Sequence, residues 1–358
     1  MKLFAILHKT NKIFYFITLG LYLLIYPGML FQIILGIVQI AIGIILLTKI
    51  KILNKENKKK VYIYWSLVFI AFILILANFE FGNDFGNFIS IFLFPMLTAT
   101  YFYFLTANIN SDSFIKAEWK NLALFNYQVD IKILEKYVPA GTEIDLWNNK
   151  CYVSLVGFMF KNTKVLGVEV PFHVNFEEVN LRFYVKRFEN GEWKRGVVFI
   201  KEIVPKKAIT FIANTLYQEH YETQKMKHEI IENENINIFT YQWKNEEKWN
   251  SIQVETKKNL IPIETNSDAE FITEHYFGYT KINEDTTFEY EVQHPKWEQL
   301  EVIASKIDID FQKTYGRNFE FLQTTNPTSV FLAKGSAIKV KNKRKLESFN
   351  LLEEAMAL

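Results

Sequence analysis

The sequence predicts two parts of different class: an N-terminal all-α bundle of four transmembrane helices, then an α+β domain with a curved, barrel-like antiparallel sheet. Three observations indicate this division. Nearly all long apolar runs lie before about residue 108, most acidic residues lie after it, and the later residues form short β-rich runs separated by turns. A chain of 358 residues is long enough for such a division. We expect a membrane domain over 1–108, a soluble domain over 109–340 and a basic, amphipathic tail over 341–358.

Four uncharged apolar runs predict the membrane helices, because a helix needs about 20 apolar residues to cross a hydrocarbon core of roughly 30 Å. With their flanks they predict spans over about 10–26, 29–48, 61–80 and 87–107. The first run is short and spans only if Lys9 and Lys12 reach the interface. Pro27-Gly28 is expected to form the hairpin turn between the first two helices, and Pro95 to kink the fourth. A cleaved signal peptide is the alternative for the first run, although no small-residue cleavage site follows it.

The distribution of lysines predicts the orientation. Residues 49–60 hold six lysines and one glutamate, whereas the two outer turns carry only Glu80 and Asp84. By the positive-inside rule the lysine-rich loop and both chain ends are cytoplasmic, which predicts a multi-pass protein of a bacterial inner membrane, in contact with lipid through its helices. Since no ionisable residue lies inside a span, the bundle is expected to be an anchor or an element that faces a small molecule, rather than a pump.

Several classes of function are disfavoured. A net charge of +2 gives no case for nucleic-acid binding, and a single cysteine, Cys151, excludes an internal disulfide and a cysteine-clustered metal site. His220, His275 and His294 lack the spacing of common metal motifs, so neither a metal nor a cofactor is expected, although zinc bound through distant histidines stays open. The sequence leaves the oligomeric state open.

The soluble part is mostly strand. Two short helices are expected, over residues 130–138 and 208–217, and the strands are expected over residues 151–160, 179–188, 196–204, 288–295 and 329–340. Glu178 and Arg182 share one face of their strand with Asn180 and Tyr184, because side chains on a strand alternate with a period of two. An inward Glu178–Arg182 pair could bind a polar ligand; an ion pair at the rim of the sheet is the alternative.

Seven phrases in one order resemble a known family: "WKNLALFNYQVD", "VPAGTEID", "VSLVGFMF", "FEEVNLRFYV", "RGVVFIKEI", "FITEHYFGYT" and "VQHPKW". The soluble part, over about residues 118–340, looks like the DUF2071 (YqjF-like) family of bacterial proteins. That family is similar in turn to acetoacetate decarboxylase. The resemblance implies an acetoacetate decarboxylase-like fold, which is a strongly curved antiparallel sheet around a buried apolar cavity. The membrane helices lie outside it.

The resemblance also implies which site residues are kept. Tyr221 stands where the decarboxylases have their reactive lysine, and Glu222 stands where they have its partner. Glu178 keeps one carboxylate of the decarboxylase site, a second falls near Tyr152 and is lost, and Lys120 stands near the position of an arginine. Without an amine at the site, imine formation is not available.

A lysine pair does occur in "VPKKAIT", where two adjacent cations could lower the pKa of one amine. Lys206 and Lys207 precede the helix instead of following it, so we expect them to face solvent.

We therefore expect a binding module whose cavity holds a small apolar or acidic molecule, with Lys120, Glu178, Arg182 and Tyr221 as the ligand-binding candidates. The alternative is an enzyme that uses acid–base chemistry through Glu178 and Tyr221, as a decarboxylase, lyase or hydrolase without a Schiff base. A third hypothesis, a purely structural membrane scaffold, predicts no cavity in the soluble part.

Overall fold

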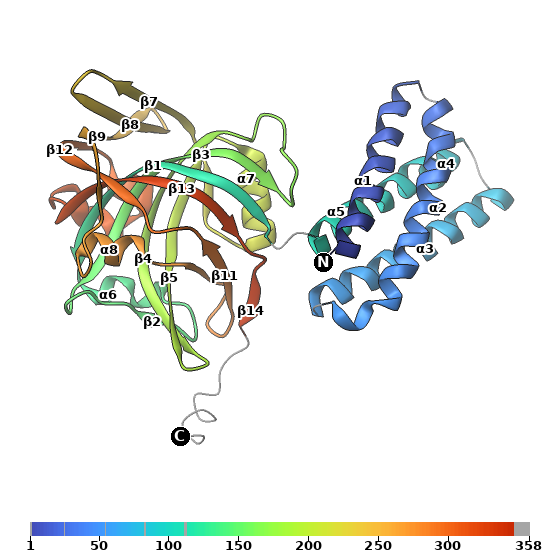
Figure 1. The fold of residues 1–358 in the computed structure, drawn as a ribbon, viewed down its shortest axis with the longest axis horizontal. Coiled ribbons are helices and arrows are strands. Elements are labelled where there is room, and N and C mark those ends of the chain that lie inside the picture. Colours follow the sequence, from blue (N-terminus) through green and yellow to red (C-terminus); the bar gives the residue numbers. More distant parts are fainter. Residues whose placement is uncertain (1, 25, 54, 82–83, 111–112, 347–358) are drawn as a thin grey trace. The chain divides into compact units, whose positions relative to one another are not determined.

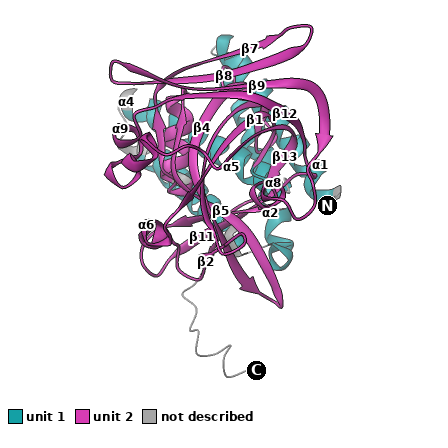
Figure 2. Cartoon of the chain, turned by 90° about the vertical axis from the view of Figure 1, so that its left-hand side faces the viewer, with its two compact units in different colours: residues 1–114 teal, residues 115–358 magenta. Residues whose placement is uncertain are grey.

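The computed structural model describes residues 2–24, 26–53, 55–81, 84–110 and 113–346. The chain divides into two compact units, Met1–Phe114 and Ile115–Leu358, which Figure 2 colours separately. The first unit is helical and the second is built on one large sheet (Figure 1).

The helical unit has four long helical stretches. They are α1 (Lys2–Leu21), α2 (Tyr26–Thr48), α3 (Lys55–Phe81) and α5 (Phe94–Asn110), with the short α4 (Asp84–Asn87) and a π-helical turn (Phe88–Leu93) leading into α5. Two 3₁₀ turns, Tyr22–Leu24 and Ile50–Ile52, follow α1 and α2. The stretches long and apolar enough to cross a membrane are Tyr26–Thr48, Asn57–Ala77 and Phe88–Asn110.

The first helix differs from its prediction. It begins at Lys2 and ends at Leu21, so it includes the basic residues that precede the apolar run, and with 20 residues it is long enough for a span but not among the helices that are also apolar enough. Pro27 lies in the first turn of α2 rather than in the loop, where its missing N–H costs no hydrogen bond. Gly28 packs against the preceding turn, since a Cβ there would lie 2.7 Å from Tyr22 Cα. Near Pro95 the helix is distorted, with the π-helical turn ending just before Phe94.

Neutral polar side chains pack in the interior of this bundle. Gln39 Nε2 donates to Asn11 Oδ1 at 2.8 Å, and Asn11 Nδ2 donates to Thr106 Oγ1 at 2.9 Å. All three residues are buried. The hydrogen bonds link α1, α2 and α5, in the manner of polar contacts between helices in an apolar medium.

The second unit contains a 14-stranded sheet. Its strands are β1 (Ile115–Val129), β2 (Glu143–Ile144), β3 (Cys151–Val165), β4 (Phe176–Glu189), β5 (Glu192–Val204), β6 (Tyr221–Thr223), β7 (Lys225–Glu232), β8 (Ile236–Asn245), β9 (Lys248–Pro262), β10 (Phe277–Lys281), β11 (Thr287–Gln293), β12 (Glu298–Asp308), β13 (Ser329–Val340) and β14 (Arg344–Leu346). The main path runs β14-β11-β10-β5-β4-β3-β1-β13-β12-β9-β8-β7, with an additional pairing of β11 with β13.

The short helices of this unit lie between strands. They are α6 (Ile131–Leu134), α7 (Lys207–Ile212), α8 (Asp268–Thr273) and α9 (Phe311–Tyr315), with 3₁₀ turns at Glu135–Tyr137 and Arg317–Gln323 and a π-helical turn at Ala213–Tyr217 that continues α7.

The sheet is mixed rather than a regular antiparallel barrel. Most neighbours are antiparallel, as expected, but β5 pairs in parallel with β10 near its start and with β6 near its end. The strand expected over 329–340 coincides with β13, and the other expected strands lie within or overlap β3, β4, β5 and β11. In the region expected to be a tail, Arg344–Leu346 pair with β11; residues 347–358 lie outside the described part of the chain.

Strand β4 separates two apolar cores. Its odd-numbered residues from Val179 to Val185 pack into a core that includes β8 and β9. Its even-numbered residues face the second core, to which β1, β3, β5, β11, β13 and α8 contribute. We call this second side, which bears Glu178, Asn180, Arg182 and Tyr184, the carboxyl face. Polar residues on a face this buried need partners, which makes it the place to search for a site.

Candidate functional site

A row of polar side chains crosses three strands on the carboxyl face. Asn180 on β4 is the register partner of Glu202 on β5, and Glu202 is the register partner of Tyr221 on β6. Register partners have Cβ atoms about 4.5–5.5 Å apart, so these side chains are neighbours. Glu178 stands beside Asn180 on β4, and Glu219 precedes Tyr221 by two residues. We call Glu178, Glu202 and Glu219 the carboxyl cluster.

Glu178 lies at the centre of the cluster, with only 2% of its surface exposed. Its Oε1 accepts a hydrogen bond from Asn180 Nδ2 at 2.9 Å, and its Oε2 accepts one from the Tyr221 hydroxyl at 3.2 Å. Burial raises the pKa of the Glu178 carboxyl to about 7, although these two hydrogen bonds and the charge of Arg182 act to lower it. The group therefore changes its protonation near neutral pH.

The other two carboxyls also hold protons tightly. Burial raises the pKa of Glu219 to about 7, against hydrogen bonds from Thr280 and Tyr290 and the charge of Lys343. The Thr280 hydroxyl donates to Glu219 Oε1 at 2.6 Å. Burial, followed by the negative charges of Glu219 and Glu178, raises the pKa of Glu202 well above its usual range.

Both tyrosines stay protonated beside these acids. Burial and the nearby carboxylates raise the pKa of Tyr221 and of Tyr290, so each phenol is a hydrogen-bond donor at neutral pH. Unlike the three carboxyls, Tyr221 and Tyr290 are only partly buried.

The helical segment before β6 positions Tyr221. Its π-helical turn ends at Tyr217, and the next residue, Gln218, adopts a left-handed conformation with φ of 57° and redirects the chain. The Asn214 amide then holds the backbone of Tyr221 from both sides: Nδ2 donates to Tyr221 O at 2.8 Å, and Tyr221 N donates to Oδ1 at 2.9 Å.

A glycine makes room for Tyr290. Gly278 on β10 is the register partner of Tyr290 on β11, and a Cβ at Gly278 would lie 2.2 Å from Tyr290 Cζ. The ring of Tyr290 therefore lies directly over the backbone of β10, and its side chain hydrogen-bonds Glu219. No side chain larger than hydrogen fits at position 278 without moving that ring.

Arg182 is buried on the same face without a carboxylate partner. It is 8% exposed, its Nη2 donates to Ile272 O at 3.3 Å, and its guanidinium lies over the ring of Tyr184 at 5.6 Å. The ion pairs between described residues include none between Arg182 and Glu178, so the rim pair considered as an alternative does not form.

Near Tyr184 lies a second cluster of polar side chains, which consists of Asp145, Arg195 and His275. His275 Nε2 bonds to Asp145 Oδ2 at 3.1 Å, Arg195 Nε donates to the same oxygen at 2.7 Å, and the His275 ring lies 4.7 Å from that of Tyr184. Burial lowers the pKa of His275 to about 4, so the imidazole is neutral at pH 7. Burial acts to raise the pKa of Asp145, but the hydrogen bonds from His275 and Arg195 leave it lowered.

Several buried polar atoms of the described residues have no hydrogen-bond partner in the protein. Three of them lie on β4 and β5: Asn180 Oδ1, Arg182 Nε and Glu202 Oε2. Buried polar atoms are satisfied in most native structures, and each exception calls for an explanation. These three side chains share the carboxyl face with Tyr221.

The structure brings together most of the predicted site residues. Glu178 and Tyr221 are in contact, and Arg182 lies on their face. Lys120 does not join them: its Nζ pairs with Glu118 Oε2 at 3.1 Å, and 37% of its side chain is exposed. Lys120 directly precedes Asn121, which adopts a left-handed conformation where the pairing of β1 with β3 becomes irregular, and this local geometry was not evident in the sequence.

The lysine pair lies elsewhere. Lys207 is exposed, and Lys206 acts on the pKa of Glu177, which bonds His228 on β7, away from the carboxyl face. Glu222, the position matching the second decarboxylase lysine, pairs with Lys201 at 2.7 Å.

Sequence reasoning missed Glu202, Glu219 and Tyr290. One signal was available for Glu202, an acid in the mostly apolar strand segment "VVFIKEIV" at a position where the strand period points inward. A second was available for Glu219, which stands two residues before Tyr221 and so shares its side. Tyr290 carried no such signal, because its role depends on the glycine opposite it.

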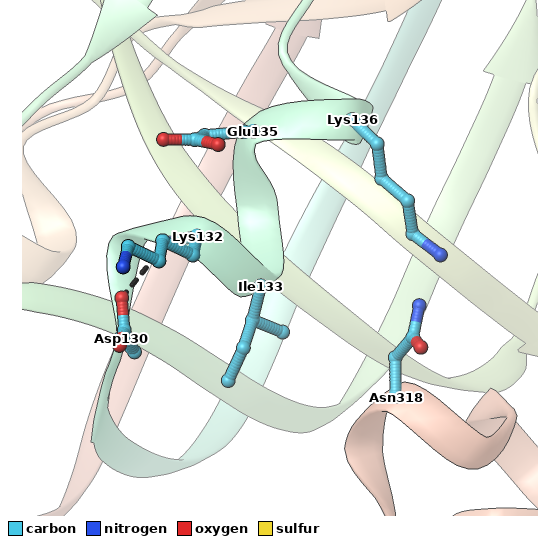
Figure 3. A pocket seen from close by; sticks show the side chains of 6 residues that line it. All are labelled: Asp130, Lys132, Ile133, Glu135, Lys136 and Asn318. Carbon is cyan, nitrogen blue, oxygen red and sulfur yellow. Dashed lines mark hydrogen bonds between the residues drawn. The ribbon is translucent and has the colours of Figure 1, made fainter.

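The described residues contain no group of three or more His, Cys, Asp or Glu side chains arranged to hold a metal ion. An open pocket of about 490 Å³ lies beside α6, lined by Asp130, Lys132, Ile133, Glu135, Lys136 and Asn318 (Figure 3). Asp130 there caps the backbone N–H of Lys132 at 2.9 Å, and none of the lining residues belongs to the carboxyl cluster.

Comparison with known proteins identifies relatives of the second unit. YqjF of Bacillus subtilis (strain 168), an uncharacterized protein, is 25% identical over 186 residues, covering 51% of this chain and 74% of YqjF. The acetoacetate decarboxylase of Legionella pneumophila is a similar solved structure, with 9% identity, a TM-score of 0.45, and coverage of 66% of this chain and 88% of that one. The enduracididine biosynthesis enzyme MppR, complexed with pyruvate, is similar at 9% identity and a TM-score of 0.47, covering 65% of this chain and 91% of that one.

The family model confirms the resemblance read from the seven phrases. The model of DUF2071, described as an uncharacterized conserved protein, matches residues 116–337, which is more than half of the chain and most of the sheet-containing unit. The chain belongs to the DUF2071 family.

Proposed function

We propose that the second unit binds a small organic acid on the carboxyl face, with Arg182 holding the carboxylate. The observation that carries the proposal is a buried guanidinium without an acidic partner, whose Nε makes no hydrogen bond. Guanidinium groups recognise carboxylates through parallel N–H donors, and burial strengthens the interaction. Apolar side chains of the surrounding core supply the rest of the surface, as in most small-molecule sites.

Calorimetric titration of the full chain in detergent tests this function. The panel is acetate, propionate, butyrate, valerate and benzoate, and we expect saturable binding of at least one of them. Arg182→Gln should weaken that binding by tenfold or more, because the carboxylate would lose its charged donor. Arg317→Gln is the matched control, since Arg317 is exposed and lies in a 3₁₀ turn whose buried residues pack into the other core. The proposal is wrong if no acid binds, or if Arg182→Gln binds as well as the parent.

Acid–base catalysis is a second candidate function. One observation favours it: two carboxyls with pKa values near 7 flank a tyrosine that remains protonated, which supplies proton acceptors and a donor at neutral pH. With an acid from the panel that binds, we would follow product formation by NMR. Turnover that disappears in Glu178→Gln while binding remains would favour the enzyme; binding without turnover in the parent would favour the binding module.

Schiff-base chemistry is tested separately. Borohydride reduction in the presence of a ketone should leave the mass of the protein unchanged, because a phenol and not an amine stands at position 221. A stable covalent adduct would contradict this expectation.

We also propose that the helical unit anchors the second unit at the cytoplasmic side of a bacterial inner membrane. The three apolar stretches and the lysine-rich segment 49–60 support this arrangement. Single cysteines can test it with a membrane-impermeant maleimide, since native Cys151 is buried. From outside the cell, Leu24→Cys should react, whereas Lys51→Cys and Thr325→Cys should not. Leu3→Cys then decides whether α1 crosses: it is protected if α1 spans and labelled if it does not.

A further inference from the structure

The buried acids of the second unit fall into two groups, according to whether they form an ion pair with a basic side chain. Six acidic side chains are buried among its described residues: Asp145, Glu177, Glu178, Glu202, Glu219 and Glu289. Three have basic partners in the protein: Asp145 with Arg195 at 2.7 Å, Glu177 with His228 at 3.4 Å, and Glu289 with Arg344 at 2.6 Å. The other three form the carboxyl cluster, and no ion pair is described for them; the charges of Arg182 and Lys343 act to lower the pKa values of Glu178 and Glu219.

The unpaired atoms beside the cluster define which hydrogen-bonding groups a ligand would have to supply. Asn180 donates through Nδ2 to Glu178, which fixes its orientation and leaves the carbonyl oxygen Oδ1 as the free atom. Its register partner Glu202 leaves Oε2 free. When Glu202 is ionised both free atoms are acceptors, so the complementary group is rich in donors. An ammonium group has three donors and no acceptor.

We propose that the ligand of the carboxyl face carries a protonated amine, which binds between Glu202 Oε2 and Asn180 Oδ1. This inference rests on the proposed function, in which Arg182 holds a carboxylate. Together the two sites select a small amino acid with its charged groups at opposite ends. The ammonium supplies the positive charge that the other buried acids receive from basic side chains, and it favours ionisation of the cluster, so a proton leaves as the amine enters.

Pairs of acids that differ only in the amine separate this inference from the proposed function. The pairs are propionate and β-alanine, butyrate and 4-aminobutyrate, and valerate and 5-aminovalerate, each titrated calorimetrically at pH 6.5 against the full chain in detergent. In at least one pair we expect the amino acid to bind tenfold or more tightly than its amine-free counterpart. Repeating the titration in two buffers of different ionisation enthalpy should show proton release for the amino acid alone.

A conservative variant checks where the amine binds. Glu202→Gln keeps the size of the side chain and removes its charge, so the ratio of the affinities for the amino acid and the amine-free acid should fall to about one. Glu222→Gln should keep the preference, because Glu222 pairs with Lys201 outside the cluster.

Each of the remaining outcomes contradicts the bound amine, and the last also contradicts the proposed function. If the amine-free acids bind as tightly as the amino acids, the organic-acid function stands and the amine is wrong. If Mg²⁺, Ca²⁺ or Zn²⁺ competes with the amino acid and strengthens binding of the amine-free acid, the missing cation is a metal ion and the amine is again wrong. If neither member of any pair binds, the proposed function fails, and the inference fails with it.

Discussion

Two hydrogen bonds from one side chain hold Tyr221 in place: Asn214 Nδ2 donates to Tyr221 O at 2.8 Å, and Tyr221 N donates to Asn214 Oδ1 at 2.9 Å. Asn214 therefore sets the position of a strand that has only three residues, and with it the contact between the Tyr221 hydroxyl and Glu178.

The first prediction concerns these two hydrogen bonds between Asn214 and Tyr221. Asn214→Ala removes both hydrogen bonds and should lower the free energy of unfolding by about 1–3 kcal/mol, because two backbone groups lose partners. It should also weaken ligand binding, since Tyr221 is no longer held. Denaturant unfolding measures the first effect and calorimetry the second. Thr215→Ala, at an exposed neighbouring position, is the control. Equal effects of the two variants would show that the hydrogen bonds of Asn214 do not position Tyr221.

The second prediction concerns the glycine beneath Tyr290. Gly278→Ala places a methyl group where the ring lies, so the protein should lose about 1–3 kcal/mol of stability and the contact between Tyr290 and Glu219 should be displaced. Tyr290→Ala removes the obstructing ring. Gly278→Ala should therefore lower the free energy of unfolding much less in a Tyr290→Ala protein than in the parent. Additive losses in this double-mutant cycle would mean that the two residues do not meet.

The third prediction is a pH dependence of stability. Glu178 has a pKa of about 7 in the folded chain against a usual value of 4.5, so the folded state binds its proton more tightly than the unfolded state does. The stabilisation from this proton is fully present below pH 4.5 and is lost as the pH rises through 7. A shift of this size corresponds to about 3 kcal/mol at most, shared among coupled groups.

Glu178→Gln should therefore stabilise the protein by about 1–3 kcal/mol at pH 8, where the parent buries a charge, and change little at pH 5. Thermal and denaturant unfolding at both values measures the difference. Glu222→Gln serves as the control, because the hydrogen bonds from Lys201 and Gln224 outweigh burial and lower the pKa of Glu222. A Glu178→Gln effect of the same size and sign at pH 5 and pH 8 would rule out ionisation as its cause.

The fourth prediction concerns the helical unit. Gln39→Leu removes the hydrogen bond to Asn11 and leaves the Asn11 carbonyl oxygen without that donor, so the detergent-solubilised protein should lose about 1 kcal/mol of stability. Ile33→Ala, which alters a side chain that is 65% exposed, should change the stability less in the same thermal unfolding experiment. The opposite order would indicate that the polar contacts do not hold these helices together.

Local pattern was enough for much of the fold. The apolar runs predicted the helical first unit, and the two-residue period of β4 was enough to place Glu178 and Arg182 on one face. The same period explains why Glu222 turns away from Tyr221, although the sequence alone did not tell which of them faces the cluster. The first helix was misjudged at its ends because Pro27 suits the first turn of a helix as well as a loop.

The site depended on contacts across strands. Glu202 became a site residue only through its register with Asn180 and Tyr221, and Tyr290 only through the glycine opposite it. Lys120, matched by its place in a sequence phrase, lies instead at an irregular part of β1 and pairs with a surface acid.

By itself, then, the sequence determined what repeats along the chain: the apolar lengths that suit helices in a bilayer, the alternation that divides a strand between two faces, and the family to which the phrases belong. Only the tertiary structure decided which acids meet, because register and the parallel pairing of β5 with β6 join residues that no local spacing relates. It also decided that these acids are buried with no ion pair among the described residues, since burial comes from surfaces that distant strands contribute.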